Sequence, residues 1–447
     1  MTLTASWAEP SSDSFADPRP SNQFLNRPGW FERAGVFVAL FTYAWGTPLE
    51  WLAFATGGSV ESSALTQLLF LGFLLLSVVS LNGNWHIALK AAKGEPLMAA
   101  FVALAVASTV WSTAPAETLR EGITLSVAYV FALHLIVRFS IREIVAMLAA
   151  TFAIGAILNL AFVAIFADLG SLSVGTDGSR GWSGITGNRN TLGRAAVLGF
   201  AVCVIQARTV RSLVWWPGFA VLNAMLAIGS NSATTLGALG GICILGTIFV
   251  GFRGRKTLYG ATMVAMGIVF STLTVLAATN LAATTGLIGR DSSFTGRLPI
   301  WIDAFVYGVS ERPLLGYGRE GFWGQGFYDF DVQLRTNENF NTPHAHNAWV
   351  DAWLEVGPLG AILLTAIIVR GLLWGTRRIR AVPTAIGMFP AVIISLAVVY
   401  SATEAGFISR SVQFIMLIVA VTEASRQKGV AEPWEPRSGS LPDPVDR

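Results

Sequence analysis

Runs of about 20 apolar residues recur along the whole chain, and no other feature constrains the fold as strongly. A helix of that length crosses the hydrocarbon layer of a bilayer. Charged residues make up 13% of the 447 residues, whereas soluble domains carry about 25%. No long stretch has the composition of a soluble domain, which argues against a soluble enzyme with one anchor. The sequence predicts an all-α polytopic membrane protein.

The apolar runs predict about twelve transmembrane helices, each near the length that a bilayer requires. Their approximate bounds are 34–55, 64–81, 96–112, 121–137, 144–166, 192–207, 213–229, 233–251, 258–284, 357–375, 383–401 and 406–424. The chain thus divides into a flexible N-terminal tail, nine helices, a long loop, three helices and a C-terminal tail. These five parts span 1–33, 34–284, 285–356, 357–424 and 425–447.

The distribution of basic residues gives an orientation, because loops on the cytoplasmic side carry an excess of Lys and Arg. Alternate loops are basic, and the short loops between them are nearly free of Lys and Arg. This alternation predicts that both termini are cytoplasmic and that the loop 285–356 is periplasmic, in a bacterial inner membrane. The basic loops hold Lys90, Lys93, Arg138, Arg142, Arg208, Arg211, Arg253, Arg255, Lys256, Arg377, Arg378 and Arg380, and the C-terminal tail adds Arg426 and Lys428.

Net charge and cysteine content exclude other classes. The net charge is +3, and the cationic residues cluster in short loops, so they set topology and do not indicate nucleic-acid binding. Cys203 and Cys243 both lie in apolar runs and give no disulfide framework.

Two motifs in the loop 285–356 imitate nucleotide sites. Residues 316–321 read G-x-G-x-x-G, but that fingerprint needs a preceding strand and a βαβ unit, so a tight glycine turn is favoured. Residues 329–331 read D-x-D, but the loop is too short to build a nucleotide-binding domain around them.

Polar chemistry gathers directly before the tenth predicted span, in "TPHAHNAWVDAWLEVGPLG". A helix is predicted over 345–356, because Gly357 is a natural end and a proline follows it. Asn347, Asp351 and Glu355 then fall on one stripe, which is predicted to line the path of a substrate or to form a wetted edge. Two tryptophans form a second stripe suited to the headgroup level.

His344 and His346 lie two residues apart in this stretch. Histidine is the side chain whose ordinary pKa, about 6.5, suits proton transfer near neutral pH. The pair is therefore a candidate general base, with a helix-capping role as the simpler interpretation. A His-x-His pair also binds metals, but no third ligand stands at convincing spacing, so neither a metal nor another cofactor is predicted.

Both long outer loops are rich in arginine. Guanidinium groups match phosphate oxygens, so this charge favours an anionic partner beyond the lipid headgroups. Outer arginines, an outer histidine and a membrane interior together suggest a lipid-linked phosphate that bears sugar. The arginines are Arg180, Arg189, Arg194, Arg290, Arg297, Arg312, Arg319 and Arg335.

The same stretches resemble the signature region of the O-antigen ligase and polysaccharide polymerase superfamily. The resemblance rests on "TGR" followed by "W", on "RPLLGYG", on "HAHNAWVDAWLEVGPLG" leading into an apolar span, and on the upstream block "GITGNRNTLGRAAVLG". It covers about residues 170 to 375.

The resemblance implies a GT-C-like membrane glycosyltransferase with short helices in its long periplasmic loop. It further implies that glycan is transferred from undecaprenyl diphosphate at the periplasmic face, with inversion and without metal or nucleotide. By resemblance, His346 is the functional histidine, His344 is the reserve, and Arg297 contacts the diphosphate.

In one place the chain departs from the family. Ligases often carry a further arginine where this chain reads "GSNSATTLG", 229–237, which contains none. Arg189 or Arg180 is the expected substitute, and the adjacent Asn190 is expected to line the substrate site.

Three functions follow as alternatives. The first is a polymerase that joins lipid-linked repeat units into an exopolysaccharide, with a chain-length regulator and a flippase as partners. The second is an O-antigen ligase that transfers lipid-linked glycan to lipid A core. The third is a polysaccharide transporter without chemistry, although the paired repeats typical of transporters are absent from the sequence. The "NRN" and "TLGR" letters favour the polymerase.

Overall fold

The structure is a computed structural model that describes residues 28–48, 50–51, 64–170, 173–174, 180–211, 214–251, 300–302, 304–323 and 344–426. The predicted span 258–284, the D-x-D motif, Arg297, and residues 1–27 and 427–447 of the two tails lie outside the described residues.

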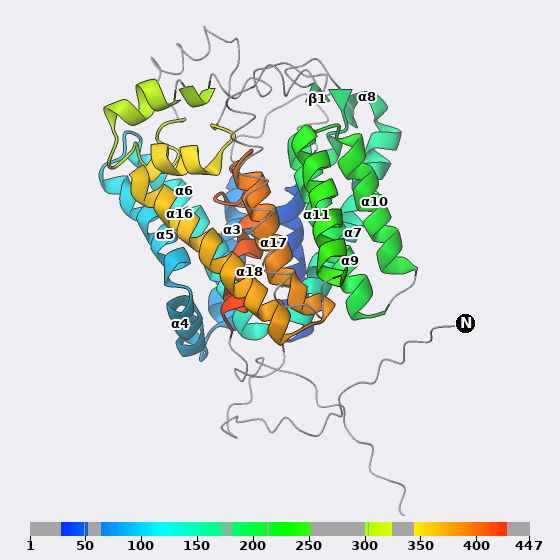
Figure 1. Ribbon diagram of the computed structural model, residues 1–447. Helices are drawn as coiled ribbons and strands as arrows, with labels where there is room; N and C mark the ends of the chain where they lie inside the picture. The colour runs from blue at the N-terminus through cyan, green and yellow to red at the C-terminus, as the bar shows by residue number, and fades with distance from the viewer. Residues whose placement is uncertain are drawn as a thin grey trace, which may run out of the picture.

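The described part of the chain is a helical bundle (Figure 1). Among the described residues the one β element is an antiparallel ribbon of β1, Ser173–Val174, and β2, Arg180–Gly181. Short 3-10 turns η2 and η3 cover Ser108–Val110 and Gly184–Thr186, and a π turn, η4, covers Ala304–Val309. The helices are α1 Trp30–Trp45, α3 Ala64–Ser80, α4 Trp85–Gly94, α5 Pro96–Ala107, α6 Pro115–Arg138, α7 Ile141–Ile165, α8 Ala167–Gly170, α9 Arg189–Thr209, α10 Trp215–Gly229, α11 Ala233–Gly251, α16 Ala348–Ala381, α17 Ala385–Ser401 and α18 Val412–Ser425.

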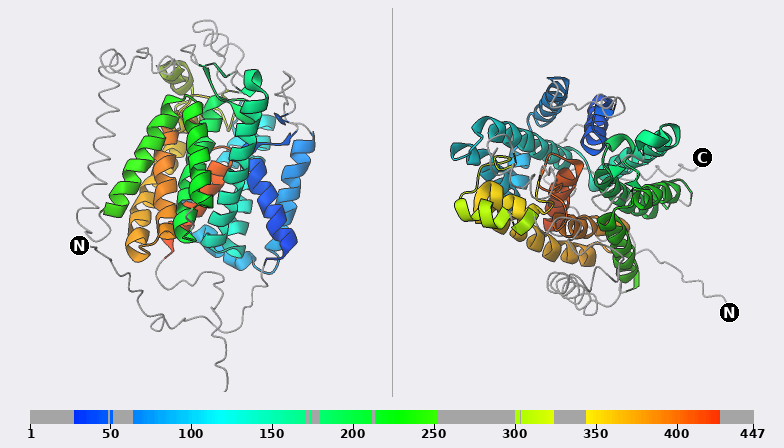
Figure 2. Two further views of the ribbon diagram at one scale, coloured as in Figure 1. Left: turned by 90° about the vertical axis from the view of Figure 1, so that its right-hand side faces the viewer. Right: turned by 90° about the horizontal axis from the view of Figure 1, so that it is seen from above.

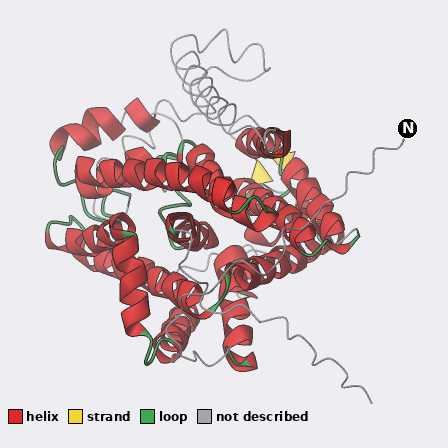
Figure 3. Cartoon of the chain, turned by 60° about the horizontal axis from the view of Figure 1, so that its bottom comes forward, coloured by secondary structure: helices red, strands yellow, loops and turns green. Residues whose placement is uncertain are grey.

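Helix α18 is the centre of the bundle. Every residue from Val412 to Ala424 is buried, and the helix lies inside the ring of the other helices when the molecule is seen from above (Figure 2, right). A helix that is apolar all round belongs in such an enclosed position. A view with the bottom of the molecule turned forward shows that helices make up nearly all of the described chain (Figure 3).

The outer helices present apolar side chains outward, as a bilayer requires. Leu68 and Leu75 on α3 and Ile362 and Leu373 on α16 are all more than half exposed. Large exposed apolar surfaces mark interaction sites, and lipid is the partner that fits several helices at once.

Four helices in the described part are long and apolar enough to cross a bilayer by themselves, namely α6, α7, α9 and α16. The pair α3 and α4, bent by 106° at a short break, is a possible fifth span. The other apolar helices are shorter than the sequence predicts. Gly46, with φ of 76°, ends α1 at Trp45, not near 55, and the Ser411 side chain caps α18, which therefore begins at 412 and not 406.

The two ends of the bundle differ in charge. At the end where α6 and α9 finish, cationic side chains include Arg138, Arg208 and Arg211. Arg378 of α16 pairs with Glu423 of α18 at this same end. We call it the basic end and the opposite one the outer end, where α6, α9 and α16 begin.

Helix α16 bends sharply near its start. Val356 and Gly357 have non-helical dihedral angles, with φ of 74° at Gly357. The Trp349 indole nitrogen, before the bend, lies 3.0 Å from Thr365 Oγ1, after it. Because sixteen residues of straight helix would separate these groups by about 24 Å, the first part of α16 folds across the outer end and only 358–381 runs through the bundle (Figure 1).

Two glycines allow this bend to pack against the loop 312–323, which we call the outer clamp. A Cβ on Gly357 would lie 2.0 Å from Leu314 O, and one on Gly316 would lie 2.5 Å from Leu354 O. Both glycines have positive φ. The peptide N–H groups of Tyr317 and Gly318 donate to Leu354 O and Glu355 O at 2.8 Å each. The G-x-G-x-x-G letters thus belong to a tight turn, as predicted.

We predict that the outer end faces the periplasm. In a background with Cys203 and Cys243 changed to Ala, Val110→Cys should react with a membrane-impermeant maleimide in cells whose outer membrane alone is permeabilised. Val210→Cys, matched in residue type and at the basic end, should react only after the inner membrane is opened. Val110 is 89% exposed and Val210 is 52% exposed, so access to reagent is not limited by packing. The reverse labelling pattern would overturn the orientation.

Candidate functional site

The two histidines lie at the outer end, directly before α16. Asn347 is the N-cap of this helix, and its side-chain oxygen accepts from the N–H groups of Trp349 and Val350. His346 has a φ of 52°, a left-handed conformation that costs a non-glycine residue about 1–3 kcal/mol and clusters at functional sites. The His344 and His346 rings pack edge to face with centroids 4.2 Å apart.

Ala345, between the histidines, is held from both sides. Its N–H donates to Asp351 Oδ1 at 2.9 Å, and its carbonyl accepts from Trp301 Nε1 at 2.8 Å. Asp351 Oδ1 also accepts from Trp323 Nε1 of the outer clamp at 2.9 Å. Asp351 is 1% exposed. The first turn of α16 and two tryptophans therefore fix the backbone of the histidine pair.

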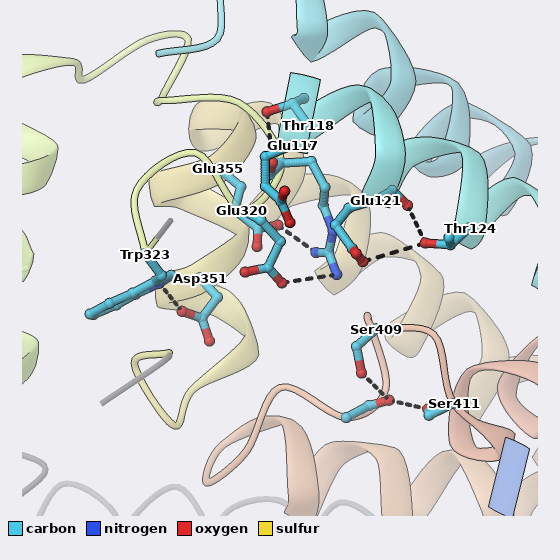
Figure 4. Close-up of polar contacts among 12 residues, drawn as sticks. Glu117, Thr118, Glu121, Thr124, Glu320, Trp323, Asp351, Glu355, Ser409 and Ser411 are labelled. Atoms are coloured by element: carbon cyan, nitrogen blue, oxygen red, sulfur yellow. Dashed lines mark hydrogen bonds and ion pairs between the residues drawn. The ribbon is translucent and has the colours of Figure 1, made fainter. Parts of the chain in front are cut away.

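One turn further along, Glu355 meets a buried guanidinium (Figure 4). Arg319 of the outer clamp lies 2.5 Å from Glu355 Oε2, and both side chains are less than 5% exposed. Burial lowers the pKa of Arg319, but the carboxylates of Glu355, Glu320 and Glu121 outweigh this and raise it above its usual range. The guanidinium stays charged and ties the clamp to α16 and to the start of α6.

Glu404 approaches His346 from the connection between α17 and α18. Its Oε2 lies 3.3 Å from His346 Nδ1 and 3.3 Å from Arg194 Nη1 of α9. The Glu404 side chain is 5% exposed, and the His346 side chain is 16% exposed. Three segments far apart in sequence thus converge on one carboxylate at the outer end.

These contacts define which nitrogens carry protons. A carboxylate accepts and does not donate, so the contact with Glu404 places a proton on His346 Nδ1. In the neutral ring His346 Nε2 is then unprotonated and able to accept a proton. The His346 N–H donates to His344 Nδ1 at 3.1 Å, so the neutral His344 carries its proton on Nε2. The contact with Glu404 holds the His346 ring in one orientation.

His344, His346 and Glu404 also offer ligand atoms within 4.8 Å of one another. The sequence lacked this third ligand, and the structure supplies it. However, Arg194 already binds the Glu404 oxygen that a metal would use. A guanidinium at that distance repels a divalent cation, so the geometry favours a base and its orienting carboxylate over a metal centre.

A cavity of about 400 Å³ lies beside this site. The residues that line it come from α1 and the segment after it, α3, η3, α9, the segment after α17 and the start of α18. Arg194 is one of them, so the guanidinium that binds Glu404 also forms part of the cavity wall. The lining consists of Thr42, Tyr43, Ala44, Trp45, Gly46, Thr47, Glu50, Trp51, Phe70, Ile185, Thr186, Thr191, Arg194, Ser409, Arg410, Ser411 and Gln413.

The other predicted site residues do not gather at the histidine pair. Arg189 is buried at the first turn of α9, and Arg180 is exposed in β2, where its carbonyl accepts from Asn231. Neither lines the cavity. Asn190 bonds through its N–H to Asn188 at 2.8 Å, as part of the helix cap. Arg297 lies outside the described residues.

On one predicted feature the structure corrects the sequence interpretation. Asp351 and Glu355 are 1% and 3% exposed, so they form no wetted edge and instead hold the histidine segment and the outer clamp. Asn347 is occupied as a helix cap.

Glu404 and the role of Arg194 escaped the sequence analysis. Glu404 is the sole acidic residue between Glu355 and Glu423. A lone carboxylate in a short outer connection was therefore the feature of the sequence that could have identified Glu404 as a site residue. Arg194 lies in the "TLGR" block. The sequence identified it as one of the outer cations but gave it no role of its own.

These features define a helical, membrane-type protein with a histidine–carboxylate pair at its outer end, and comparison with known proteins finds two matches. Residues 218–365 match the family described as O-antigen ligase. The chain is also 29% identical over 376 residues, 78% of both chains, to the exopolysaccharide production protein ExoQ of Rhizobium meliloti (strain 1021). Both matches agree with the resemblance to the O-antigen ligase and polysaccharide polymerase superfamily.

We predict that Asp351→Ala destabilises the protein. The change leaves the N–H groups of Ala345 and Trp323 without their shared acceptor, and each unsatisfied buried donor costs about 1–3 kcal/mol. The midpoint of thermal unfolding in detergent should fall by several degrees. Asp168→Ala, at an exposed position in α8, should leave it unchanged. Equal midpoints for both variants would remove the anchoring role of Asp351.

Proposed function

We propose that this protein polymerises undecaprenyl-diphosphate-linked oligosaccharide repeat units into an exopolysaccharide at the periplasmic face of the inner membrane. The observation that carries the proposal is the contact of His346 with Glu404, in which a histidine with a free Nε2 is oriented by a buried carboxylate. The match to the O-antigen ligase family supports glycan transfer, and the name of the Rhizobium relative, an exopolysaccharide production protein, favours the polymerase over the ligase.

In the proposed reaction an acceptor sugar hydroxyl attacks the anomeric carbon of the lipid-linked donor. The new C–O bond forms as the bond to the diphosphate oxygen breaks, with inversion at that carbon. His346 Nε2 takes the hydroxyl proton, and Glu404 stabilises the imidazolium. The electron pair of the broken bond leaves on the diphosphate.

The leaving diphosphate needs cations in a site shielded from water. We assign this contact to Arg194, in preference to Arg189 and Arg180, because Arg194 lies next to Glu404 and lines the cavity. Its Nε is buried and has no hydrogen-bond partner among the described residues. Arg297 is the second proposed contact, on the strength of the family resemblance. Preorganised cations of this kind contribute several kcal/mol to the transition state.

Asp351 and Glu355 are proposed to position other residues and not to contact the substrate. They bind no substrate in this scheme but hold Ala345 and the outer clamp, so that His346 keeps its left-handed backbone. A ligase would use the same base and the same cations. A transporter would have no use for the oriented histidine.

We predict that His346→Ala lowers polymer synthesis by about 100- to 10,000-fold, measured with purified protein and lipid-linked donor. Glu404→Gln should cause a smaller loss, because the amide can orient the ring but cannot stabilise its positive charge. His86→Ala, an exposed histidine on α4 at the basic end, is the matched control and should keep full activity.

Two results would change this assignment. Activity that survives His346→Ala and disappears in His344→Ala would move the base by two residues. Polymer from the double variant would exclude a histidine base altogether.

We predict that Arg194→Lys loses most activity, because lysine lacks the planar fork that binds Glu404 and phosphate together. The loss should exceed tenfold, since several kcal/mol of transition-state stabilisation is at stake (about 1.4 kcal/mol per factor of ten). Arg208→Lys, an exposed arginine at the other end of the same helix, should be neutral. Full activity of Arg194→Lys would exclude the proposed contact.

A further inference from the structure

The cavity beside the base site contains an arginine that the proposed reaction does not use. Arg410 lines the cavity, and its guanidinium carbon lies 4.7 Å from the centroid of the Phe70 ring. No carboxylate among the described residues forms an ion pair with it. Arg194, the other cation of the wall, is bound to Glu404. Among the described residues, the Arg410 guanidinium is therefore a positive charge in the cavity wall that no carboxylate neutralises.

A second observation points to a ligand in the same place. The Tyr43 hydroxyl is buried and has no hydrogen-bond partner among the described residues, and the same is true of Arg194 Nε. Both residues line the cavity, and Tyr43 is 7% exposed. Buried polar groups in native proteins are nearly always paired, so these donors predict oxygen atoms of a bound molecule.

The rest of the wall suits a sugar. Trp45, Trp51 and Phe70 offer aromatic faces, and Thr47, Thr186, Thr191, Ser409, Ser411 and Gln413 offer hydroxyl and amide groups. Aromatic surface combined with a few placed polar groups is typical of small-molecule sites of about 300–1,000 Å³, and the cavity volume of about 400 Å³ falls in this range. Glu50 can accept hydrogen bonds from sugar hydroxyl groups.

We propose that the cavity is a subsite for an acidic sugar residue of the glycan, with its carboxylate on Arg410 and its ring against the aromatic wall. This inference rests on the proposed function and adds the substrate class, a glycan that carries an acidic residue close to the bond being made. The link to the reaction is Arg194, which lines the cavity on one side and binds Glu404 on the other. Arg410 is a specificity residue in this scheme and takes no part in proton transfer.

The experiment measures binding without turnover. Full-length protein in lipid nanodiscs is titrated with glucuronate and, as the neutral analogue, with glucose, and binding is followed by ligand-observed NMR. Glucuronate should bind about tenfold more tightly than glucose, because a hydrogen bond to a charged group is stronger than a neutral one. Arg410→Gln should remove this preference and leave glucose binding unchanged, and Arg410→Lys should retain part of it.

The matched control is Arg377→Gln. Arg377 also stacks on an aromatic ring, 4.7 Å from the centroid of Trp374, but at the basic end. This variant should keep the preference for glucuronate. Equal affinities of the wild-type protein for glucuronate and glucose would overturn the inference, as would a preference that survives Arg410→Gln.

Two further arms separate this inference from the proposed function. Inorganic pyrophosphate that displaces glucuronate, and whose own binding is lost in Arg410→Gln, would show a diphosphate site and overturn the acidic-sugar subsite. His346→Ala should bind glucuronate normally while it makes no polymer. If His346→Ala still makes polymer, the proposed base fails and the binding result stands unaffected.

Discussion

The arrangement of side chains at the outer end depends on the bend of α16 at Val356 and Gly357. Because the first turns of this helix fold across the bundle, Asp351 and Glu355 point into protein and can bind the histidine segment and the outer clamp. A straight helix would carry the histidines away from Glu404 and Arg194. Both Gly357, at the bend, and His346, before the helix, have positive φ, and both conformations are needed to bring the histidines to Glu404.

Charge at the site is arranged in linked pairs. Arg319 binds Glu355, and Arg194 and His346 share Glu404. A buried ion pair is weak evidence for stability, but removing one partner leaves an uncompensated charge and is strongly destabilising. The first pair holds the outer clamp on α16, and Glu404 holds His346 and Arg194 together, so the same type of interaction fixes both parts of the outer end.

Local patterns predicted much of this protein. Apolar runs predicted the helices, Gly357 predicted the break in α16, and the histidine pair was found at the helix start. The burial of Asp351 and Glu355 was not predictable, because a stripe at i and i+4 looks the same whether water or another loop covers it. Glu404 meets His346 only through tertiary packing across 58 residues. Some apolar helices were predicted too long, because the residues that end or cap them, such as Gly46 and Ser411, lie inside apolar stretches.

The shortness of the central helix sets the depth of the site. Helix α18 has 14 residues, about 21 Å of rise, while the hydrocarbon layer is about 30 Å thick. Its apolar neighbours shield it from lipid, so it need not span that layer. The space left above its first turn is taken by the segment 402–411 and by the cavity that Ser409, Arg410, Ser411 and Gln413 line. Polar side chains therefore lie directly above the first turn of the central helix, among helices that are otherwise apolar.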